Sequence, residues 1–163
     1  MILALDIGNT NVVLGCIADG EILFTERMAT DSGKTELDYA ISLKMVLELR
    51  EIKVSEITGA IIGSVVPPVT SLMREAIRKV TGQEALVVNV DMNIGLEVLM
   101  DNPSSVGTDL IVGAVAGINR YPVPLILIDM GTATTICVVN ENKQYGLCSN
   151  ERLEFLGDSI VGF

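Results

Sequence analysis

The chain has 163 residues, of which 49% are hydrophobic, so it is long enough to bury one core and too short for two large domains. Its net charge of −10 would repel the phosphate backbone of a nucleic acid. Histidine is absent, which excludes Ser-His catalysis and most zinc sites and leaves acid–base chemistry to carboxylates. The three cysteines lack metal-ligand spacing, and no segment has the features of a secretion signal or a membrane span, so we expect a cytoplasmic protein.

The first half of the chain predicts an antiparallel meander followed by alternating helices and strands. Turn residues at Gly8-Asn9 and Asp19-Gly20 separate three apolar segments. We expect strands over residues 2–5, 11–17, 21–28, 57–66 and 85–90, and amphipathic helices over residues 35–52 and 69–80. Helices that alternate with strands after a meander indicate a mixed α/β sheet of the ribonuclease-H type.

The second half of the chain repeats the opening pattern. A helix is expected over residues 106–119, and apolar strands over 125–128 and 134–139 then flank an Asp-x-Gly turn, as they do at the start of the chain. The alternative is two unrelated hairpins that share turn residues. We expect a first domain over residues 1–119, the start of a second domain over 120–147 and a tail over 148–163.

Both Asp-x-Gly turns suit a bound phosphate. Glycine permits close backbone approach, and the Thr and Asn residues that follow supply hydroxyl and amide donors. Asp6 and Asp129 would repel a phosphate directly, but each could act on it through a cation, and phosphoryl transfer depends on such charge neutralisation. The alternative is that both aspartates simply cap their turns.

Three blocks of the sequence resemble those of type III pantothenate kinase, in the same order and at the same spacing. They are Asp-Ile-Gly-Asn-Thr-Asn at residues 6–11, Asp-Asn-Pro with Val-Gly-Thr-Asp at 101–109, and Asp-Met-Gly-Thr-Ala-Thr-Thr at 129–135. The resemblance covers residues 1–145. It implies a ribonuclease-H-like fold of the acetate and sugar kinase, heat-shock ATPase and actin superfamily, with an incomplete second domain.

The resemblance also implies an activity and its requirements. The reaction would be ATP-dependent phosphorylation of pantothenate to 4′-phosphopantothenate, the first step of coenzyme A biosynthesis. The enzyme would be a cytoplasmic homodimer that needs Mg²⁺ together with K⁺ or NH₄⁺. Because the family continues into a longer second domain, a competing interpretation is a non-catalytic remnant that binds phosphate or a partner protein.

Residue roles follow from the same resemblance. Asp109 would be the base that accepts the proton of the pantothenate hydroxyl, Asp6 would position magnesium and phosphate, and Asp129 would hold potassium or ammonium. The ATP-phosphate contacts would come from Ile7, Gly8, Asn9, Thr10, Asn11, Val12, Val13 and Thr132, and the pantothenate contacts from Met100, Gly107, Thr108, Asp109 and Leu110.

The residues themselves support a carboxylate base, since no histidine is available to orient the attacking alcohol. The alternative is that Asp109 only complements the dipole at the start of its helix. The sequence departs from the family at Leu110, where many members have Arg, and at Met100, where many have Tyr. Both positions touch pantothenate in the family.

The last residues resemble a different family. Residues 150–159 are similar to the signature helix of ribonuclease III, in which the positions matching Glu154 and Asp158 help to bind catalytic magnesium. Their i, i+4 spacing would place both carboxylates on one helical face. Two carboxylates without further ligands cannot build the two-metal site that phosphodiester cleavage uses, so a solvated amphipathic tail is the main alternative.

Overall fold

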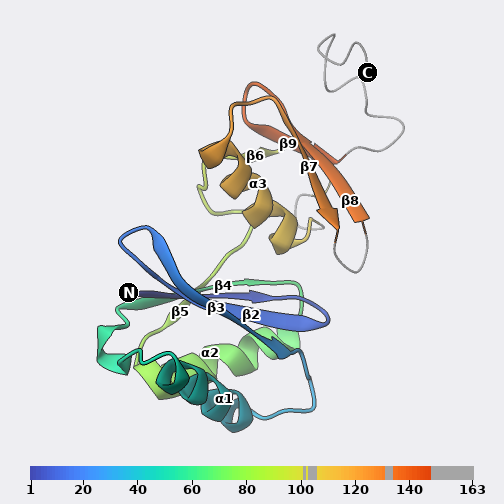
Figure 1. Ribbon diagram of the computed structural model, residues 1–163. Helices are drawn as coiled ribbons and strands as arrows, with labels where there is room; N and C mark the ends of the chain where they lie inside the picture. The colour runs from blue at the N-terminus through green and yellow to red at the C-terminus, as the bar shows by residue number, and fades with distance from the viewer. Residues whose placement is uncertain (101, 103–105, 131–133, 148–163) are drawn as a thin grey trace. The chain divides into compact units, whose positions relative to one another are not determined.

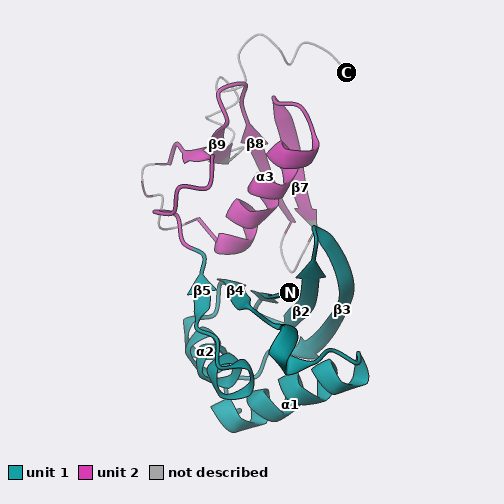
Figure 2. Cartoon of the chain, turned by 90° about the vertical axis from the view of Figure 1, so that its left-hand side faces the viewer, with its two compact units in different colours: residues 1–88 teal, residues 89–163 magenta. Residues whose placement is uncertain are grey.

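The computed structural model describes residues 1–100, 102, 106–130 and 134–147. The chain forms two compact units, Met1–Val88 and Asn89–Phe163, here called unit 1 and unit 2 (Figure 2). Each unit has its own sheet and its own hydrophobic core. No helix among the described residues is long and apolar enough to cross a bilayer.

Unit 1 is built on a five-stranded mixed sheet in the order β3-β2-β1-β4-β5 (Figure 1). Strands β1 (Ile2–Ile7), β2 (Asn11–Ala18) and β3 (Glu21–Ala29) form the antiparallel meander. Strands β4 (Gly59–Ser64) and β5 (Ala85–Val87) extend the sheet in parallel on the other side of β1. The β2–β3 turn uses positive φ angles at Asp19 and Gly20, as a tight hairpin turn requires.

Two helices cover one face of this sheet (Figure 1). Helix α1 (Glu36–Leu49) begins at Thr35, whose side chain forms a reciprocal capping box with Asp38. Helix α2 (Pro67–Thr81) has prolines in its first turn and ends at Gly82, which adopts a left-handed conformation. A short 3₁₀ segment, Val54–Glu56, lies between α1 and β4. The alternate residues Leu3, Leu5 and Ile7 of β1 are buried beneath the two helices.

Unit 2 has a four-stranded sheet in the order β6-β9-β8-β7. Strand β7 (Leu125–Met130) pairs antiparallel with β8 (Thr134–Val139), and β8 pairs antiparallel with β9 (Gln144–Leu147). Strand β6 (Glu97–Val98) runs parallel to β9. Helix α3 (Thr108–Arg120) packs on one face, and its close approach depends on Gly117, where a Cβ would lie 3.0 Å from Leu127 Cδ2.

The structure confirms the predicted meander, the two helices of unit 1, helix α3 and the β7–β8 hairpin. Strands β6 and β9 were not predicted, and β5 ends earlier than expected, at Val87. The two compact units divide after Val88, whereas the sequence led us to expect a boundary after residue 119. The reason is that α3 packs on β7 and belongs to the core of unit 2. The tail over residues 148–163 lies outside the described residues.

Candidate functional site

The two Asp-x-Gly sequences occupy corresponding places in two hairpins. Asp6 is the penultimate residue of β1 and pairs with Val13 of β2, while Asp129 is the penultimate residue of β7 and pairs with Thr135 of β8. Both aspartate side chains are exposed. Each of the two hairpins therefore carries an exposed carboxylate near the end of its first strand.

The β1–β2 turn is held rigidly by hydrogen bonds. The Gly8 amide donates to the Asn11 carbonyl at 2.9 Å, and the hydroxyl of Thr30 donates to the Gly8 carbonyl at 2.7 Å. The Thr30 amide also donates to the Thr10 carbonyl at 3.0 Å. Asn9 and Thr10 remain exposed at the tip, so their polar groups can reach a ligand from a fixed backbone.

Gly8 is required in this turn by the close approach of its own backbone. A Cβ on Gly8 would lie 3.3 Å from the Asn11 carbonyl oxygen, which is tighter than an ordinary contact. The neighbouring residues are apolar and face the core on one side: Ile7 and Val12 are fully buried, whereas Val13 is partly exposed. The turn is thus anchored by the core and presents its polar tip outward.

The corresponding turn of unit 2 differs slightly. The last paired residues are Ile7 and Val12 in the first hairpin, and Met130 and Thr134 in the second, so the second connection is shorter. Thr132, the residue expected to contact ATP, lies outside the described residues, as do Glu154 and Asp158.

Asp109 lies in the first turn of α3, where the sequence predicted it. Its side chain is exposed, and its Oδ1 accepts a hydrogen bond from the Leu110 amide at 2.8 Å. Gly107 is the N-cap residue and supplies no side-chain cap, so Asp109 provides the carboxylate that complements the helix dipole. This hydrogen bond is compatible with the alternative that Asp109 complements the helix dipole. It uses one carboxylate oxygen and leaves the other available to a hydroxyl donor.

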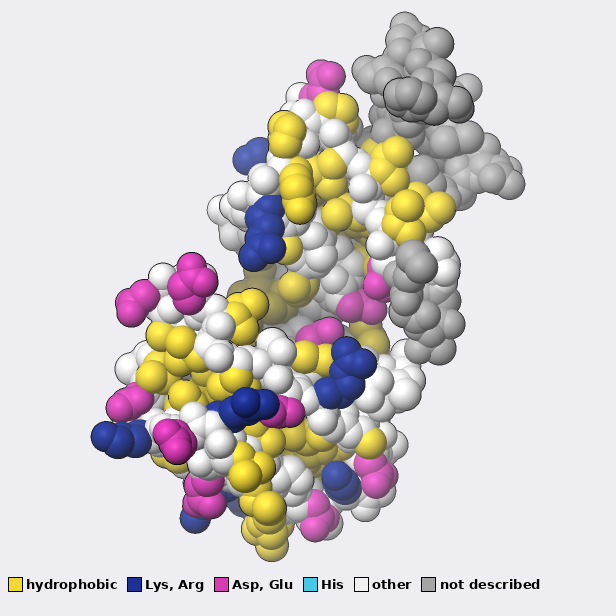
Figure 3. All heavy atoms as spheres, viewed as in Figure 1, with side chains coloured by type: hydrophobic (Ala, Val, Ile, Leu, Met, Phe, Trp, Pro, Cys, Tyr) yellow, Lys and Arg dark blue, Asp and Glu magenta, His cyan; other side chains and the backbone are white. Residues whose placement is uncertain are grey.

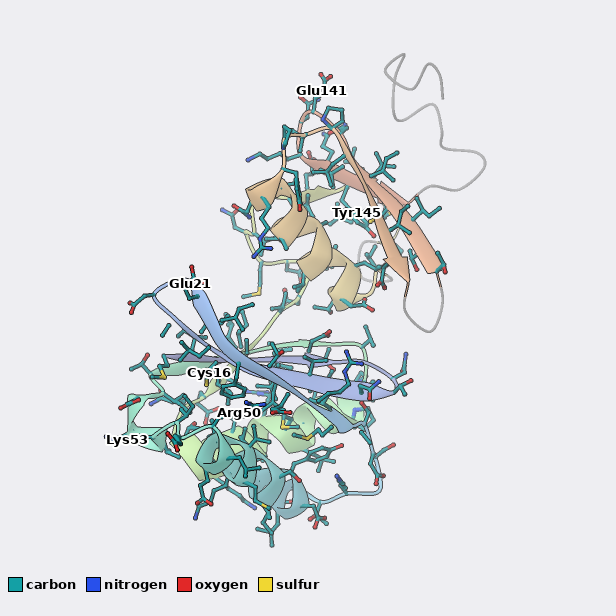
Figure 4. The ribbon with its side chains drawn as sticks, in the orientation of Figure 1. Cys16, Glu21, Arg50, Lys53, Glu141 and Tyr145 are labelled. Atoms are coloured by element: carbon teal, nitrogen blue, oxygen red, sulfur yellow. The ribbon has the colours of Figure 1, made fainter. Side chains whose placement is uncertain are left out.

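Met100 and Leu110, the two positions that depart from the family, are partly buried against the core of unit 2. That core also contains Tyr145 of β9, which sequence reasoning missed (Figure 4). Its hydroxyl is fully buried without an oxygen or nitrogen partner among the described residues, and the Cys137 thiol is a weak neighbour. Burial above all, and then the charges of Cys137 and Asp109, raise the pKa of Tyr145.

The expected site residues are divided between the units. The β1–β2 turn with Asp6 belongs to unit 1, whereas Met100, Asp109 and Asp129 belong to unit 2. Among the described residues, no group of three or more acidic, Cys or His side chains is placed to hold a metal ion. A magnesium ion held by one carboxylate and substrate phosphates does not need such a group.

Comparison with solved structures identifies the fold. The chain is similar to the reductive activator for a corrinoid, iron–sulfur protein, with a TM-score of 0.54 and 16% identity over 86% of this chain and 29% of the other. It is also similar to a candidate 2-dehydro-3-deoxygalactonokinase from Sinorhizobium meliloti, with a TM-score of 0.53 and 12% identity over 90% and 53% of the two chains. A third match is a candidate N-acetylglucosamine kinase from Porphyromonas gingivalis, with a TM-score of 0.50 and 17% identity over 97% and 50%. These similarities confirm the expected α/β fold class, which the chain shares with sugar kinases.

Comparison of sequences identifies the family. The type III pantothenate kinase of Geobacillus sp. strain WCH70 is 45% identical over 145 residues. These residues make up 89% of this chain and 56% of the relative, so the chain spans little more than half the length of that protein. The family model described as type III pantothenate kinase matches residues 2–146, which contain all three sequence blocks. The chain therefore belongs to the type III pantothenate kinase family.

Proposed function

We propose that this chain supplies the ATP and pantothenate contacts of a kinase that converts pantothenate to 4′-phosphopantothenate, the first step of coenzyme A biosynthesis. The observation that carries the proposal is the pair of corresponding hairpins, each with an exposed carboxylate at the end of a buried strand. A kinase needs such groups around the phosphates of ATP, because phosphoryl transfer relies on positioning and charge neutralisation. The family match over residues 2–146 supports the assignment.

The β1–β2 turn is the proposed first ATP-phosphate loop. Asn9 and Thr10 are exposed at its tip, and Gly8 allows the backbone to approach a phosphate closely. The hydrogen bonds from Thr30 hold the turn before a ligand arrives, so little entropy is lost on binding. In the β7–β8 hairpin, Thr132 is proposed to contact ATP.

Two cations are proposed to assist. Asp6 is an exposed oxygen donor beside the phosphate loop, which fits a magnesium ion that takes its other ligands from phosphates and water. Asp129 offers a comparable exposed carboxylate for K⁺ or NH₄⁺. When bound, the cations would neutralise charge on the phosphates.

Asp109 is the proposed general base. One carboxylate oxygen accepts from the Leu110 amide at 2.8 Å, which fixes the orientation of the group. The other oxygen accepts the proton of the pantothenate hydroxyl while the hydroxyl oxygen forms a bond to the γ-phosphorus of ATP. The bond between that phosphorus and the bridging oxygen breaks at the same time, and ADP leaves.

The substrate contacts proposed for Gly107 and Thr108 lie beside this carboxylate, in partly exposed backbone at the start of α3. Met100 and Leu110 present apolar surface instead of the Tyr and Arg found in many members. We propose that they contact the apolar part of pantothenate and add no hydrogen bond. The active protein is proposed to be a cytoplasmic homodimer.

A second candidate function is phosphate or nucleotide binding without turnover. The specific observation that favours it is the coverage: the chain matches 56% of its Geobacillus relative, so groups contributed by the rest of that protein are not matched.

One experiment separates the two functions. ADP formation is measured with ATP, Mg²⁺ and K⁺, with and without pantothenate, and nucleotide binding is measured in parallel. Asp109→Asn is expected to reduce pantothenate-dependent ADP formation by about 100-fold or more and to leave nucleotide binding unchanged. Asp91→Asn, which removes another exposed carboxylate of unit 2, is the matched control and should change neither quantity. Binding without pantothenate-dependent ADP formation in the unaltered chain would support the second function.

A further inference from the structure

Arg27 is the only basic residue in the five strands of unit 1, all of which the structure describes. It is exposed and lies in β3, where it pairs with Val13 of β2, and Val13 pairs in turn with Asp6 of β1. Residues that pair directly across neighbouring strands point to the same face of a sheet. Arg27, Val13 and Asp6 therefore form one row across three strands, here called the Asp6–Arg27 row.

The Asp6–Arg27 row lies on the face of the sheet opposite α1 and α2. Ile7, the residue of β1 that follows Asp6, points the other way and is fully buried beneath the helices. The row also lies close to the β1–β2 turn, because Thr30, three residues beyond Arg27, donates to the Gly8 carbonyl at 2.7 Å. Neighbouring strands are about 4.8 Å apart, which places the Cα atoms of Arg27 and Asp6 about 10 Å apart. An arginine side chain that extends toward the turn bridges much of that span.

The guanidinium of Arg27 has no ion-pair or hydrogen-bond partner among the described residues. The other three arginines of unit 1 each pair with a glutamate, and these pairs are Arg50–Glu26, Arg74–Glu84 and Arg78–Glu75. Figure 3 shows acidic and basic side chains side by side on unit 1. In a chain with a net charge of −10, a cation that no carboxylate neutralises is available to an anion from solution.

The β1–β2 turn offers a phosphate no positively charged side chain of its own. Asn9 and Thr10 at its tip are neutral, and Asp6 beside it is an anion that acts on a phosphate only through a cation. A guanidinium supplies a fixed positive charge and binds phosphate oxygens through two parallel N–H donors. Arg27 is therefore the side chain of this sheet whose chemistry complements the proposed phosphate loop.

We propose that Arg27 is a further nucleotide-binding residue, whose guanidinium donates to the phosphate oxygens of ATP when the nucleotide lies against the β1–β2 turn. Arg27 lies outside all three sequence blocks that carry the family resemblance. The inference rests on the proposed function, because it needs a nucleotide at this turn, but it requires neither pantothenate nor turnover. The alternative is that Arg27 is a solvated charge that keeps the edge strand β3 from pairing with another chain.

The test measures binding of Mg²⁺-ATP to the full chain by titration calorimetry. Arg27→Gln is expected to weaken binding by about 10-fold or more, because charged hydrogen bonds to phosphate are lost. Arg27→Lys keeps the charge without the parallel donors, so its affinity should fall between those of Arg27→Gln and the unaltered chain. In the unaltered chain, the Nε–H NMR signal of Arg27 should shift on addition of Mg²⁺-ATP and stay in place on addition of adenosine, which has no phosphate.

Arg120→Gln is the matched control, because Arg120 is also exposed and has no ion-pair partner among the described residues. It should leave the affinity for Mg²⁺-ATP unchanged. Hydrogen exchange in β1–β3 without nucleotide should be the same in Arg27→Gln as in the unaltered chain, which separates a lost contact from a lost fold. If that exchange rises, the NMR shift of Arg27 in the unaltered chain decides.

Four results would overturn the proposal. They are a full affinity for Mg²⁺-ATP in Arg27→Gln, an equal loss in Arg120→Gln, an Arg27 signal that ATP does not move, and no binding of Mg²⁺-ATP by the unaltered chain. The kinase assignment fails separately. ATP binding that depends on Arg27 without pantothenate-dependent ADP formation would count against the kinase and leave the role of Arg27 standing, whereas turnover that depends on Asp109 but not on Arg27 would do the reverse.

Discussion

The β1–β2 hairpin of unit 1 and the β7–β8 hairpin of unit 2 share an Asp-x-Gly turn and an antiparallel register, yet they are covered on opposite faces. In unit 1 the helices lie on the face of Leu3, Leu5 and Ile7. In unit 2 helix α3 lies on the face of Leu125 and Leu127, against Gly117. Local sequence therefore sets the hairpin and its turn, whereas the helices that pack on the sheet, which follow the hairpin in unit 1 and precede it in unit 2, decide which face is buried.

The two buried tyrosines show a second contrast. Tyr39 and Tyr145 both have 0% exposure. In unit 1 the Tyr39 hydroxyl donates to the Asp31 carbonyl at 2.9 Å and accepts from the Asp31 amide at 3.0 Å. In unit 2 the Tyr145 hydroxyl lacks such partners among the described residues. Among the described residues, the buried side-chain polar atoms of unit 1 have hydrogen-bond partners, whereas the Tyr145 hydroxyl of unit 2 has no oxygen or nitrogen partner, which costs stability.

The largest expected effect comes from truncating corresponding core positions. Leu14→Ala should lower the free energy of unfolding of unit 1 by about 3 kcal/mol, because it opens a cavity in a closed core. Ile136→Ala, at the corresponding position of unit 2, should cost less than about 1 kcal/mol, since the side chain is 43% exposed. Native-state hydrogen exchange of amides in β2 and β8 measures both values. Equal losses at the two positions would show that the hairpins are equally covered in solution.

An intermediate effect is expected for the tyrosines. Tyr39→Phe should destabilise unit 1 by about 1–2 kcal/mol, because the backbone groups of Asp31 lose their partner. Tyr145→Phe should leave unit 2 within about 0.5 kcal/mol of its original stability or raise it, because the variant removes a buried hydroxyl that has no oxygen or nitrogen partner among the described residues. Urea unfolding of each variant provides the measurement. A loss for Tyr145→Phe as large as that for Tyr39→Phe would contradict the contrast.

The smallest effect concerns the contact between the two helices that cover unit 1. Lys79 Nζ donates to Glu36 Oε1 at 2.8 Å, and this hydrogen bond is the main reason that the pKa of Glu36 is lowered. Because the pKa of Glu36 is lower in the folded than in the unfolded protein, the stability that this contact contributes is present above the unfolded-state pKa. It is lost as the pH falls through the folded-state pKa. Lys79→Met should raise the pKa of Glu36 toward its ordinary value, as followed by NMR titration of the carboxyl carbon. Lys53→Met, which removes an exposed lysine elsewhere in unit 1, is the control. If the pKa of Glu36 rose as much in Lys53→Met as in Lys79→Met, the contact with Lys79 would not be its specific cause.

Much of unit 1 could be predicted from the sequence because its signals are local and strong. The Asp19-Gly20 turn fixes the β2–β3 hairpin, and Pro67 and Gly82 mark the two ends of α2. Strand β6 could not be predicted, because its two residues, Glu97–Val98, are too few to show any periodicity and depend on pairing with β9. The boundary between the two units depends on which sheet α3 packs against. Gly117 of α3 lies against Leu125 and Leu127 of β7, and the sequence around Gly117 does not indicate which sheet this helix will contact.

The candidate site was predictable to a similar degree. Asp6 and Asp129 were singled out by their turn patterns and Asp109 by the family resemblance, and the structure places them near strand ends and in the first turn of a helix. Tyr145 was missed, because a single tyrosine in the four-residue strand Gln144–Leu147 gives no pattern that marks it as special. Only the three-dimensional structure reveals that its hydroxyl is buried without an oxygen or nitrogen partner among the described residues, and that Asp109 is among the charges that raise its pKa.

The most direct test of the central claim is whether each of the two hairpin turns responds to nucleotide. Hydrogen exchange of the full chain is measured with and without Mg²⁺-ATP, and the amides of residues 8–13 and 130–135 are followed. The account predicts protection in both turns, with Asp6→Asn reducing it through loss of the proposed magnesium contact. Unchanged exchange in both turns at saturating nucleotide, or protection confined to other segments, would contradict the claim that these hairpins form the phosphate-binding elements of a pantothenate kinase.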